Sequence, residues 1–292
     1  MKLSVVTDEV SNDLETAIEL ISDWGLNYVE LRGIGTQRVG QLDSFGQDQL
    51  FKTVKQSGIK VVALSPGVFK ISLPQSFSEL AGLLSWHART EFYEYERQKE
   101  LVERHLTELL PNTIALAEKL DLQRILVFGF IKPVGTKAEY PPAVVDYLGQ
   151  AAKLAEKAGV VLALENEHVC WADTALNTKK VIEQVGSPAL RLNWDPANAY
   201  IANEMPFPHG YQLIKDLVAH VHFKDVVTNP VTGEKRCAVD GEIDWNGQLK
   251  ALQNDGYQGF LSIETHCKPK IMSTKECLER VLGVLGRGVL GI

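Results

Sequence analysis

Residues 159–165 read GVVLALE, a glycine followed by a run of apolar residues that ends at the carboxylate of Glu165. A short, nearly continuous apolar run of this kind is typical of a strand buried on both faces in a parallel sheet. A glycine just before such a run is typical of the loop that leads from a helix into a strand. The stretch therefore indicates one helix–loop–strand unit whose strand ends on an acid.

Similar apolar runs recur along the chain, with helical segments between them. The eight predicted strands are Leu3–Thr7, Tyr28–Arg32, Lys60–Ser65, Arg124–Gly129, Val160–Glu165, Leu190–Asp195, Ala219–Lys224 and Gly259–Glu264. The segments between them repeat their apolar residues with a period of about 3.6, which predicts amphipathic helices. In the first of these, Asp13–Trp24, we expect Asn12 and Glu15 to cap the helix and Gly25 to end it.

Alternating strands and helices predict parallel βα units, and eight such units can close into a (β/α)8 TIM barrel. The chain has 292 residues and is 45% hydrophobic, which suits a barrel of about 250 residues with insertions. We therefore expect one TIM barrel domain over residues 1–292. A doubly wound open sheet is the alternative, but it favours a glycine-rich loop after the first strand, and Thr7–Ser11 contains no glycine. Residues 66–100 and 228–244 predict long loops over the C-terminal face of the barrel.

The charge and hydrophobicity of the chain disfavour two classes of partner, nucleic acids and membranes. The formal net charge of -7 disfavours general nucleic-acid binding, because an acidic chain repels phosphate backbones. The first residues, MKLSVVTDEV, contain too short an apolar run for a signal peptide. No stretch approaches the roughly 18 apolar residues needed to span a bilayer. These features predict a cytoplasmic protein with neither nucleic acid nor a membrane as partner.

Four consecutive predicted strands end on, or close to, a polar group: Glu165, Asp195, His222 and Glu264. The carboxyl ends of parallel barrel strands meet at the same mouth. Side chains alternate across a strand, and the positions next to these polar groups, such as Trp194, are mostly large and apolar. We therefore expect the four polar groups to point inward and toward one another.

A positive charge must neutralise three carboxylates that face each other in a medium of low dielectric constant. A divalent cation would do so directly, and oxygen ligands with one imidazole suit Mn, Mg, Co or Zn. We therefore predict one divalent metal ion on these four residues. The alternative is a cluster of ion pairs that includes Lys224. His220 lies on the same side of its strand as His222 but one layer deeper, and we expect it to support the site or to pack in the core.

The chain resembles the sugar phosphate isomerase/epimerase family, which has the xylose isomerase-like TIM barrel, over almost its whole length. The shared motifs are, in order, GLNYVELR, ALEN, WDPAN, HVHFKD, GEIDW and GYQGFLSIE. The resemblance implies a metal on Glu165, Asp195, His222 and Glu264. It also implies that the two glutamates are catalytic, one removing a proton from the substrate carbon and the other returning it on the opposite face. The metal would hold substrate oxygens and stabilise an enediolate.

Six residues are expected to contact the substrate. They are Asn198, Glu167, His168, Trp171, Arg236 and Glu242. Asn198 stands where the epimerases of the family usually carry a substrate-binding histidine, three residues after the metal-binding aspartate. Arg236, or its neighbour Lys235, corresponds to an arginine of their loop after the seventh strand. For Glu167, His168, Trp171 and Glu242, the alternative is a structural role in their loops.

The resemblance implies a metal-dependent isomerase or epimerase that acts on a keto sugar or related polyol by proton abstraction next to a metal-bound carbonyl. An inosose-type dehydratase, which is a lyase, is the alternative on the same scaffold. An abasic-site endonuclease is disfavoured, because that class needs several additional histidines and the chain has only seven. A non-catalytic sugar-binding protein is disfavoured by the intact acids at the mouth. Members of the family often form dimers or tetramers, so the resemblance also allows a homo-oligomer.

Overall fold

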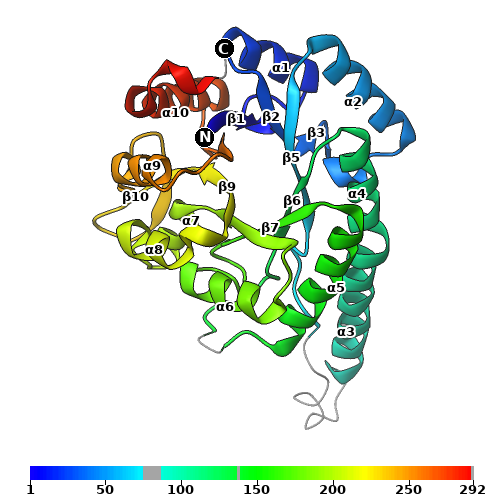
Figure 1. Ribbon diagram of the computed structural model, residues 1–292. Coiled ribbons are helices and arrows are strands. Elements are labelled where there is room, and N and C mark those ends of the chain that lie inside the picture. The colour runs from blue at the N-terminus through cyan, green and yellow to red at the C-terminus, as the bar shows by residue number, and fades with distance from the viewer. Residues whose placement is uncertain (75–86, 137–138, 291–292) are drawn as a thin grey trace.

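Eight parallel strands close into a barrel in the order β1–β12–β9–β8–β7–β6–β5–β2 (Figure 1). The computed structural model describes residues 1–74, 87–136 and 139–290. The barrel strands are β1 (Lys2–Val6), β2 (Tyr28–Leu31), β5 (Lys60–Val68), β6 (Arg124–Phe128), β7 (Val161–Glu165), β8 (Leu190–Trp194), β9 (Val218–Phe223) and β12 (Phe260–Ile263). This arrangement confirms the predicted (β/α)8 TIM barrel, and each predicted strand overlaps one barrel strand.

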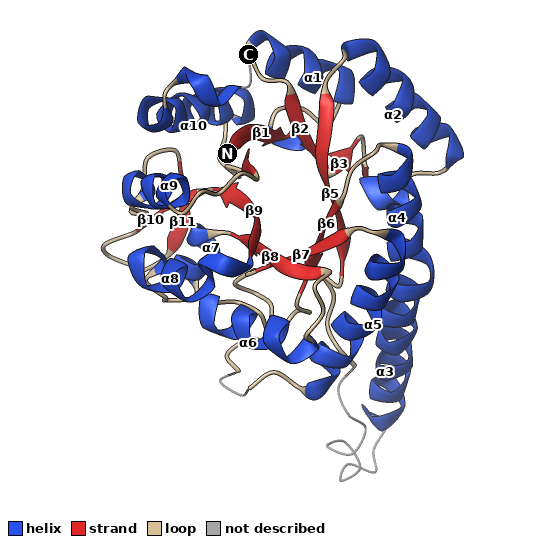
Figure 2. Ribbon diagram, viewed as in Figure 1, coloured by secondary structure: helices blue, strands red, loops and turns tan. Residues whose placement is uncertain are grey.

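Helices form an outer layer around the ring of strands, as Figure 2 shows. They are α1 (Leu14–Asp23), α2 (Ser44–Ser57), α3 (His87–Arg104), α4 (Leu110–Lys119), α5 (Pro142–Ala158), α6 (Ala175–Val185), α7 (Pro196–Ile201), α8 (Tyr211–Ile214), α9 (Trp245–Asn254) and α10 (Lys270–Leu285). In the described part of the chain, none of these helices combines the length and the hydrophobicity that a bilayer span requires.

The ends of α1 show which local signals were interpreted correctly. The N-cap is Asp13, whose carboxylate accepts a hydrogen bond of 2.9 Å from the backbone N–H of Thr16. The expected capping pair of Asn12 and Glu15 is therefore wrong, since the Asn12 amide instead donates to the backbone carbonyl of Gly35. The expected stop at Gly25 is confirmed, because this residue has a φ of 87°, which glycine adopts without strain.

Alternate residues of the barrel strands face the interior and the helices, as predicted. On β7, Ala163 lies beside Leu126 in register and packs with Ala63 in a small apolar cluster inside the barrel. Leu162, on the opposite face, belongs to the large core between the barrel and the helices. The same alternation turns Glu165 toward the interior, at the end of the strand.

Polar side chains fill the next layer of the barrel interior. Ser4, Glu30, His220 and Ser262 are each 0% exposed, and the two serine hydroxyls lie 2.6 Å apart. Buried polar groups are stable only when they are hydrogen-bonded. This layer therefore forms a polar floor beneath the mouth of the barrel.

Two small antiparallel sheets follow barrel strands. One pairs β3 (Gly33–Ile34) with β4 (Gln37–Arg38), and the other pairs β10 (Asp225–Thr228) with β11 (Lys235–Ala238). The second sheet means that part of the expected polar loop 228–244 is a hairpin. The other expected loop, 66–100, is wrong at both ends, because residues 66–68 belong to β5 and residues 87–100 belong to α3. Residues 75–86 lie outside the described part of the chain.

Truncation of a side chain in the outer core tests this packing. We expect Leu162→Ala to lower the free energy of unfolding by about 2–5 kcal/mol, because the substitution leaves a cavity in a fully buried site. Leu176→Ala, at a helix position where the leucine is 45% exposed, is the matched control and should change it by less than about 0.5 kcal/mol. Urea unfolding measures both, and equal losses would contradict the proposed packing.

Candidate metal centre and active site

The structure brings the four predicted ligands together at the mouth of the barrel. Glu165 ends β7, Asp195 follows β8, His222 lies in β9 and Glu264 follows β12. Each offers one ligand atom, and these atoms all lie within 4.8 Å of one another. All four side chains are buried. The arrangement follows from strands that end at the same level and from the alternation of their side chains.

The His222 ring is oriented by a carboxylate that the sequence analysis did not identify. The Nε2 atom lies 3.2 Å from both carboxylate oxygens of Glu30, which comes from β2. The Nδ1 atom lies 3.2 Å from Glu264 and 3.6 Å from Glu165, but it has no hydrogen-bond partner of acceptable geometry among the described residues. A proton on Nε2 leaves a lone pair on Nδ1, and a carboxylate that orients an imidazole in this way is common at metal sites.

The same Glu30 carboxylate also binds His220. The Nε2 atom of His220 lies 2.9 Å from Glu30 and 3.0 Å from the hydroxyl of Ser262. Burial alone would raise the pKa of Glu30, but the charges and hydrogen bonds of His222 and His220 hold it well below its usual value. His220 therefore lies beneath the four-residue cluster and supports it through Glu30.

Asn166, in the ALEN motif, connects the ends of two strands. Its amide nitrogen donates to the backbone carbonyl of Asp195, and its amide oxygen accepts from the backbone N–H of the same residue, both at 2.8 Å. The Asp195 carboxylate in turn accepts from the backbone N–H of Asn198 at 2.9 Å and so caps helix α7. These bonds hold the Asp195 side chain in position at the mouth.

Lys224 contacts two of the three carboxylates. Its Nζ atom lies 2.7 Å from Asp195 and 3.3 Å from Glu264. Burial opposes the charge of this ammonium group, but Asp195 and Glu264 raise its pKa well above the usual value. Part of the negative charge at the mouth is therefore balanced by a lysine, as in the ion-pair alternative.

Arg32 connects the cluster to the segment after β1. It forms ion pairs with Asp8 at 3.0 Å, with Glu9 at 2.5 Å and with Glu264. The side chain of His266 also approaches Glu9, at 2.8 Å. Another group with metal-ligand spacing consists of Glu9, Glu264 and His266. Both of its carboxylates already form ion pairs with the Arg32 guanidinium.

Glu165 is the carboxylate whose one ion-pair contact among the described residues is with the imidazole of His222, whose Nδ1 atom lies 3.6 Å away. Among the described residues it pairs with neither lysine nor arginine, and it accepts hydrogen bonds from the amides of Asn198 at 3.0 Å and Asn193 at 3.3 Å. Burial raises the pKa of Glu165 to about 7, the charge of His222 opposes this rise, and the charge of Glu264 adds to it. An additional cation at this position would stabilise the charged form, so the donor set fits a divalent ion.

Three of the six predicted substrate contacts lie beside the cluster. The Asn198 amide donates to Glu165 at 3.0 Å and to Asp195 at 3.1 Å. The His168 ring lies 2.9 Å from the Glu167 carboxylate and 3.0 Å from the Asn198 amide oxygen. These three residues therefore extend the polar network from the four-residue cluster to the rim of the mouth.

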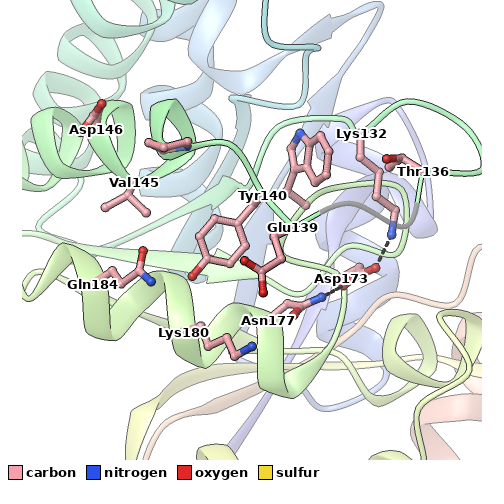
Figure 3. Close-up of a pocket in the computed structure, with 12 residues that line it drawn as sticks. Lys132, Thr136, Glu139, Tyr140, Val145, Asp146, Asp173, Asn177, Lys180 and Gln184 are labelled. Carbon is pink, nitrogen blue, oxygen red and sulfur yellow. Dashed lines mark hydrogen bonds and ion pairs between the residues drawn. The ribbon is translucent and has the colours of Figure 1, made fainter.

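The other three lie elsewhere. Trp171 lines a cavity of about 650 Å³ between α5 and α6, near Lys132 and Asp173, which form an ion pair (Figure 3). Arg236 is exposed on β11. The exposed Glu242 accepts hydrogen bonds from the hydroxyl of Tyr200 and from Thr228, and so supports its own loop. No hydrogen bond or ion pair within the described ranges joins Trp171, Arg236 or Glu242 to the cluster.

Removal of the charge on Glu30 should weaken the site without removing a ligand. We expect Glu30→Gln to lower the affinity for Mn²⁺ or Zn²⁺ by about 10–100-fold, because the amide orients His222 less firmly. Titration calorimetry measures the affinity, and circular dichroism verifies the fold. Glu234→Gln, which makes the same charge change at an exposed position, is the control. An unchanged affinity in Glu30→Gln would show that His222 does not depend on this carboxylate.

The sequence of this chain was compared with those of known families and proteins. The sequence matches the family described as xylose isomerase-like TIM barrel over residues 18–282. Inosose dehydratase from Geobacillus thermodenitrificans is 26% identical over 162 residues, which represent 50% of this chain and 53% of that enzyme. The chain thus matches about half the length of this curated relative.

Solved structures share the fold over nearly the whole chain. D-allulose 3-epimerase from Methylomonas sp., in complex with D-allulose, superimposes with a TM-score of 0.69 at 14% identity and covers 97% of both chains. A xylose isomerase-like TIM barrel protein from Mycobacterium smegmatis, in complex with magnesium, gives a TM-score of 0.67 at 15% identity, over 94% of this chain and 89% of that one. The match over residues 18–282, together with the closed barrel, shows that the chain belongs to the xylose isomerase-like TIM barrel family.

Proposed function

We propose that this protein is a divalent-metal-dependent isomerase or epimerase that acts on a keto sugar or related polyol. The observation that carries the proposal is the buried cluster of three carboxylates around the Nδ1 atom of His222, which makes no hydrogen bond of acceptable geometry within the described ranges. Lys224 and Arg32 do not contact Glu165, so a further cation is favoured there. Mn, Mg, Co and Zn all suit this set of oxygen and imidazole ligands.

Glu165 and Glu264 are the groups that we expect to move protons at the substrate carbon. A metal on the four ligands would act as a Lewis acid toward the carbonyl group and lower the barrier to loss of the adjacent proton. The two glutamates come from β7 and β12, and two other strands separate β7 from β12 in the ring. They therefore reach the mouth from different sides, as removal and return of a proton on opposite faces of a planar enediolate would require.

Dehydration is the second candidate reaction. It is favoured by the 26% identity with an inosose dehydratase over half the chain. Both candidates begin with removal of a proton next to a carbonyl group, so the same two glutamates would serve either. They differ in whether a hydroxyl group subsequently leaves the substrate.

Elemental analysis and isotope exchange test the proposal together. We expect about one divalent ion per wild-type chain, and loss of both metal and activity in Glu165→Gln and Glu264→Gln. Metal-loaded enzyme should exchange the carbon-bound proton of a suitable hydroxy ketone for deuterium in deuterated water, as NMR would show. Glu234→Gln is the matched control and should retain both properties. Full metal occupancy in both glutamate variants would contradict the ligand assignment.

The affinity for metal should increase with pH. Burial opposes protonation of His222, but the charges of Glu30, Glu264 and Glu165 hold its pKa well above the usual value. The pKa of Glu165 is raised to about 7. Both groups therefore carry protons in the metal-free site at slightly acid pH, and the metal must displace them.

We expect the affinity to fall as the pH drops below 7, by about tenfold per pH unit for each proton displaced. Titration calorimetry in buffers of different ionisation enthalpy would measure both the affinity and the protons released. A constant affinity between pH 6 and 8, without proton release, would contradict these protonation states.

A further inference from the structure

A second proton-carrying group lies beside the metal ligands and has no role in the reaction proposed above. The Nδ1 atom of His168 lies 2.9 Å from the carboxylate of Glu167 and 3.0 Å from the amide oxygen of Asn198. Both neighbours accept hydrogen bonds, so Nδ1 must carry a proton. The ring is therefore held in one orientation and in one tautomer, or as the imidazolium.

Glu167 is itself held firmly in its charged form. Its carboxylate lies 2.5 Å from the Nζ atom of Lys70, and its side chain is only 7% exposed. A buried carboxylate that contacts one ring nitrogen orients the imidazole and stabilises its charged form, as in catalytic dyads.

The other ring nitrogen of His168 is available. No hydrogen bond or ion pair to Nε2 occurs in the described part of the chain, and the side chain is 36% exposed. The hydrogen bond with Glu167 raises the pKa of His168, although burial and the charge of Lys224 oppose the rise. The contact with Glu167 thus favours the charged ring, and a histidine oriented in this way can act as a proton donor.

The position of His168 relative to the cluster is set by one intervening residue. The Asn198 amide oxygen contacts the His168 ring, while its nitrogen donates to the carboxylates of Glu165 and Asp195. His168 thus lies two hydrogen-bonded steps from two of the four ligands, on the solvent-accessible side. A substrate bound over the cluster would contact the carboxylates on its inner side and the His168 imidazole at the rim of the mouth.

We propose that His168 is a catalytic residue that donates a proton to a departing substrate hydroxyl, which makes the site competent to dehydrate a β-hydroxy ketone. This inference rests on the proposed proton abstraction by the glutamates, and it assigns a proton donor to dehydration, the second candidate reaction. Neither carboxylate then has to serve both the carbon and the oxygen of the substrate, since the two proton transfers use separate groups.

Dehydration removes a proton from one carbon and a hydroxyl group from the neighbouring carbon. A glutamate takes the proton from the carbon next to the carbonyl group, and the C–H electron pair becomes the double bond of the enolate. The carbonyl π pair, which moved onto the enolate oxygen in this step, then re-forms the carbonyl group, and the carbon–carbon pair shifts to make a double bond with the neighbouring carbon. The C–O bond of that carbon breaks as this double bond forms, its electron pair leaves with the oxygen, and this oxygen takes the proton from Nε2 of His168. Exchange with solvent removes the proton from the glutamate and returns one to the imidazole. The net products are an unsaturated ketone and water.

The test separates loss of the carbon-bound proton from loss of water. Metal-loaded wild-type and His168→Asn proteins are incubated in deuterated water with an inosose, which is a polyhydroxy cyclohexanone, and with D-allulose and D-fructose. Asparagine can still donate from the position of Nδ1 but lacks Nε2. NMR measures deuterium at carbon, and ultraviolet absorption measures the unsaturated ketone. His209→Asn, at an exposed histidine whose Nδ1 atom lies 2.9 Å from the sulfur of Met205, is the matched control.

We expect His168→Asn to keep its deuterium exchange within about threefold of wild type while water loss falls by about 100-fold or more, the usual range for a lost general acid. The His209 variant should match wild type in both. Unchanged water loss in His168→Asn, or equal losses of exchange and water loss, would overturn the inference. So would a wild-type enzyme that labels these ketones but dehydrates none. A wild-type enzyme that labels none would instead overturn the proposed function, and the inference with it.

Discussion

Repulsion among buried carboxylates is the constraint on which the mouth of this barrel depends. Glu165, Asp195 and Glu264 converge within a few ångströms because their strands end together. Lys224 and Arg32 balance part of this charge, but neither contacts Glu165. One more positive charge would complete the balance at Glu165, and this remaining demand is the physical basis for the metal that we propose.

The side chains inside the barrel form layers that support the cluster at the mouth. Small apolar side chains such as Ala163 fill one layer, and the polar layer next to it contains Glu30 between His220 and His222. The polar layer costs free energy to bury, which its hydrogen bonds offset. It places the His222 ring so that one nitrogen is held from beneath while the other faces the carboxylates. The interior thus acts as a rigid support for a ligand set that solvent would otherwise reorient.

One departure from the usual family pattern has a structural consequence. Asn198 stands where epimerases of the family usually carry a substrate-binding histidine. In this chain the Asn198 amide links Glu165 to His168, because its nitrogen donates to the Glu165 carboxylate and its oxygen contacts the His168 ring. A histidine is present at the rim after all, but it comes from the loop after β7, where the Glu167 carboxylate orients it. The histidine at the rim of this barrel, His168, therefore comes from a different loop than the substrate-binding histidine of those epimerases.

The sequence by itself determined the eight strands, the inward-facing side of the last four, and the four residues that meet at the mouth. Such features depend on local periodicity and on the rule that parallel strands end at one face. Asn12 shows the limit of local signals, because a tertiary contact with Gly35 competes for its side chain. Only the tertiary structure decided that Glu30 lies beneath His222, from a strand far away in sequence, and that Glu242 turns toward its own loop. Closure and stagger of the barrel determine which inward groups meet, and no single segment contains that information.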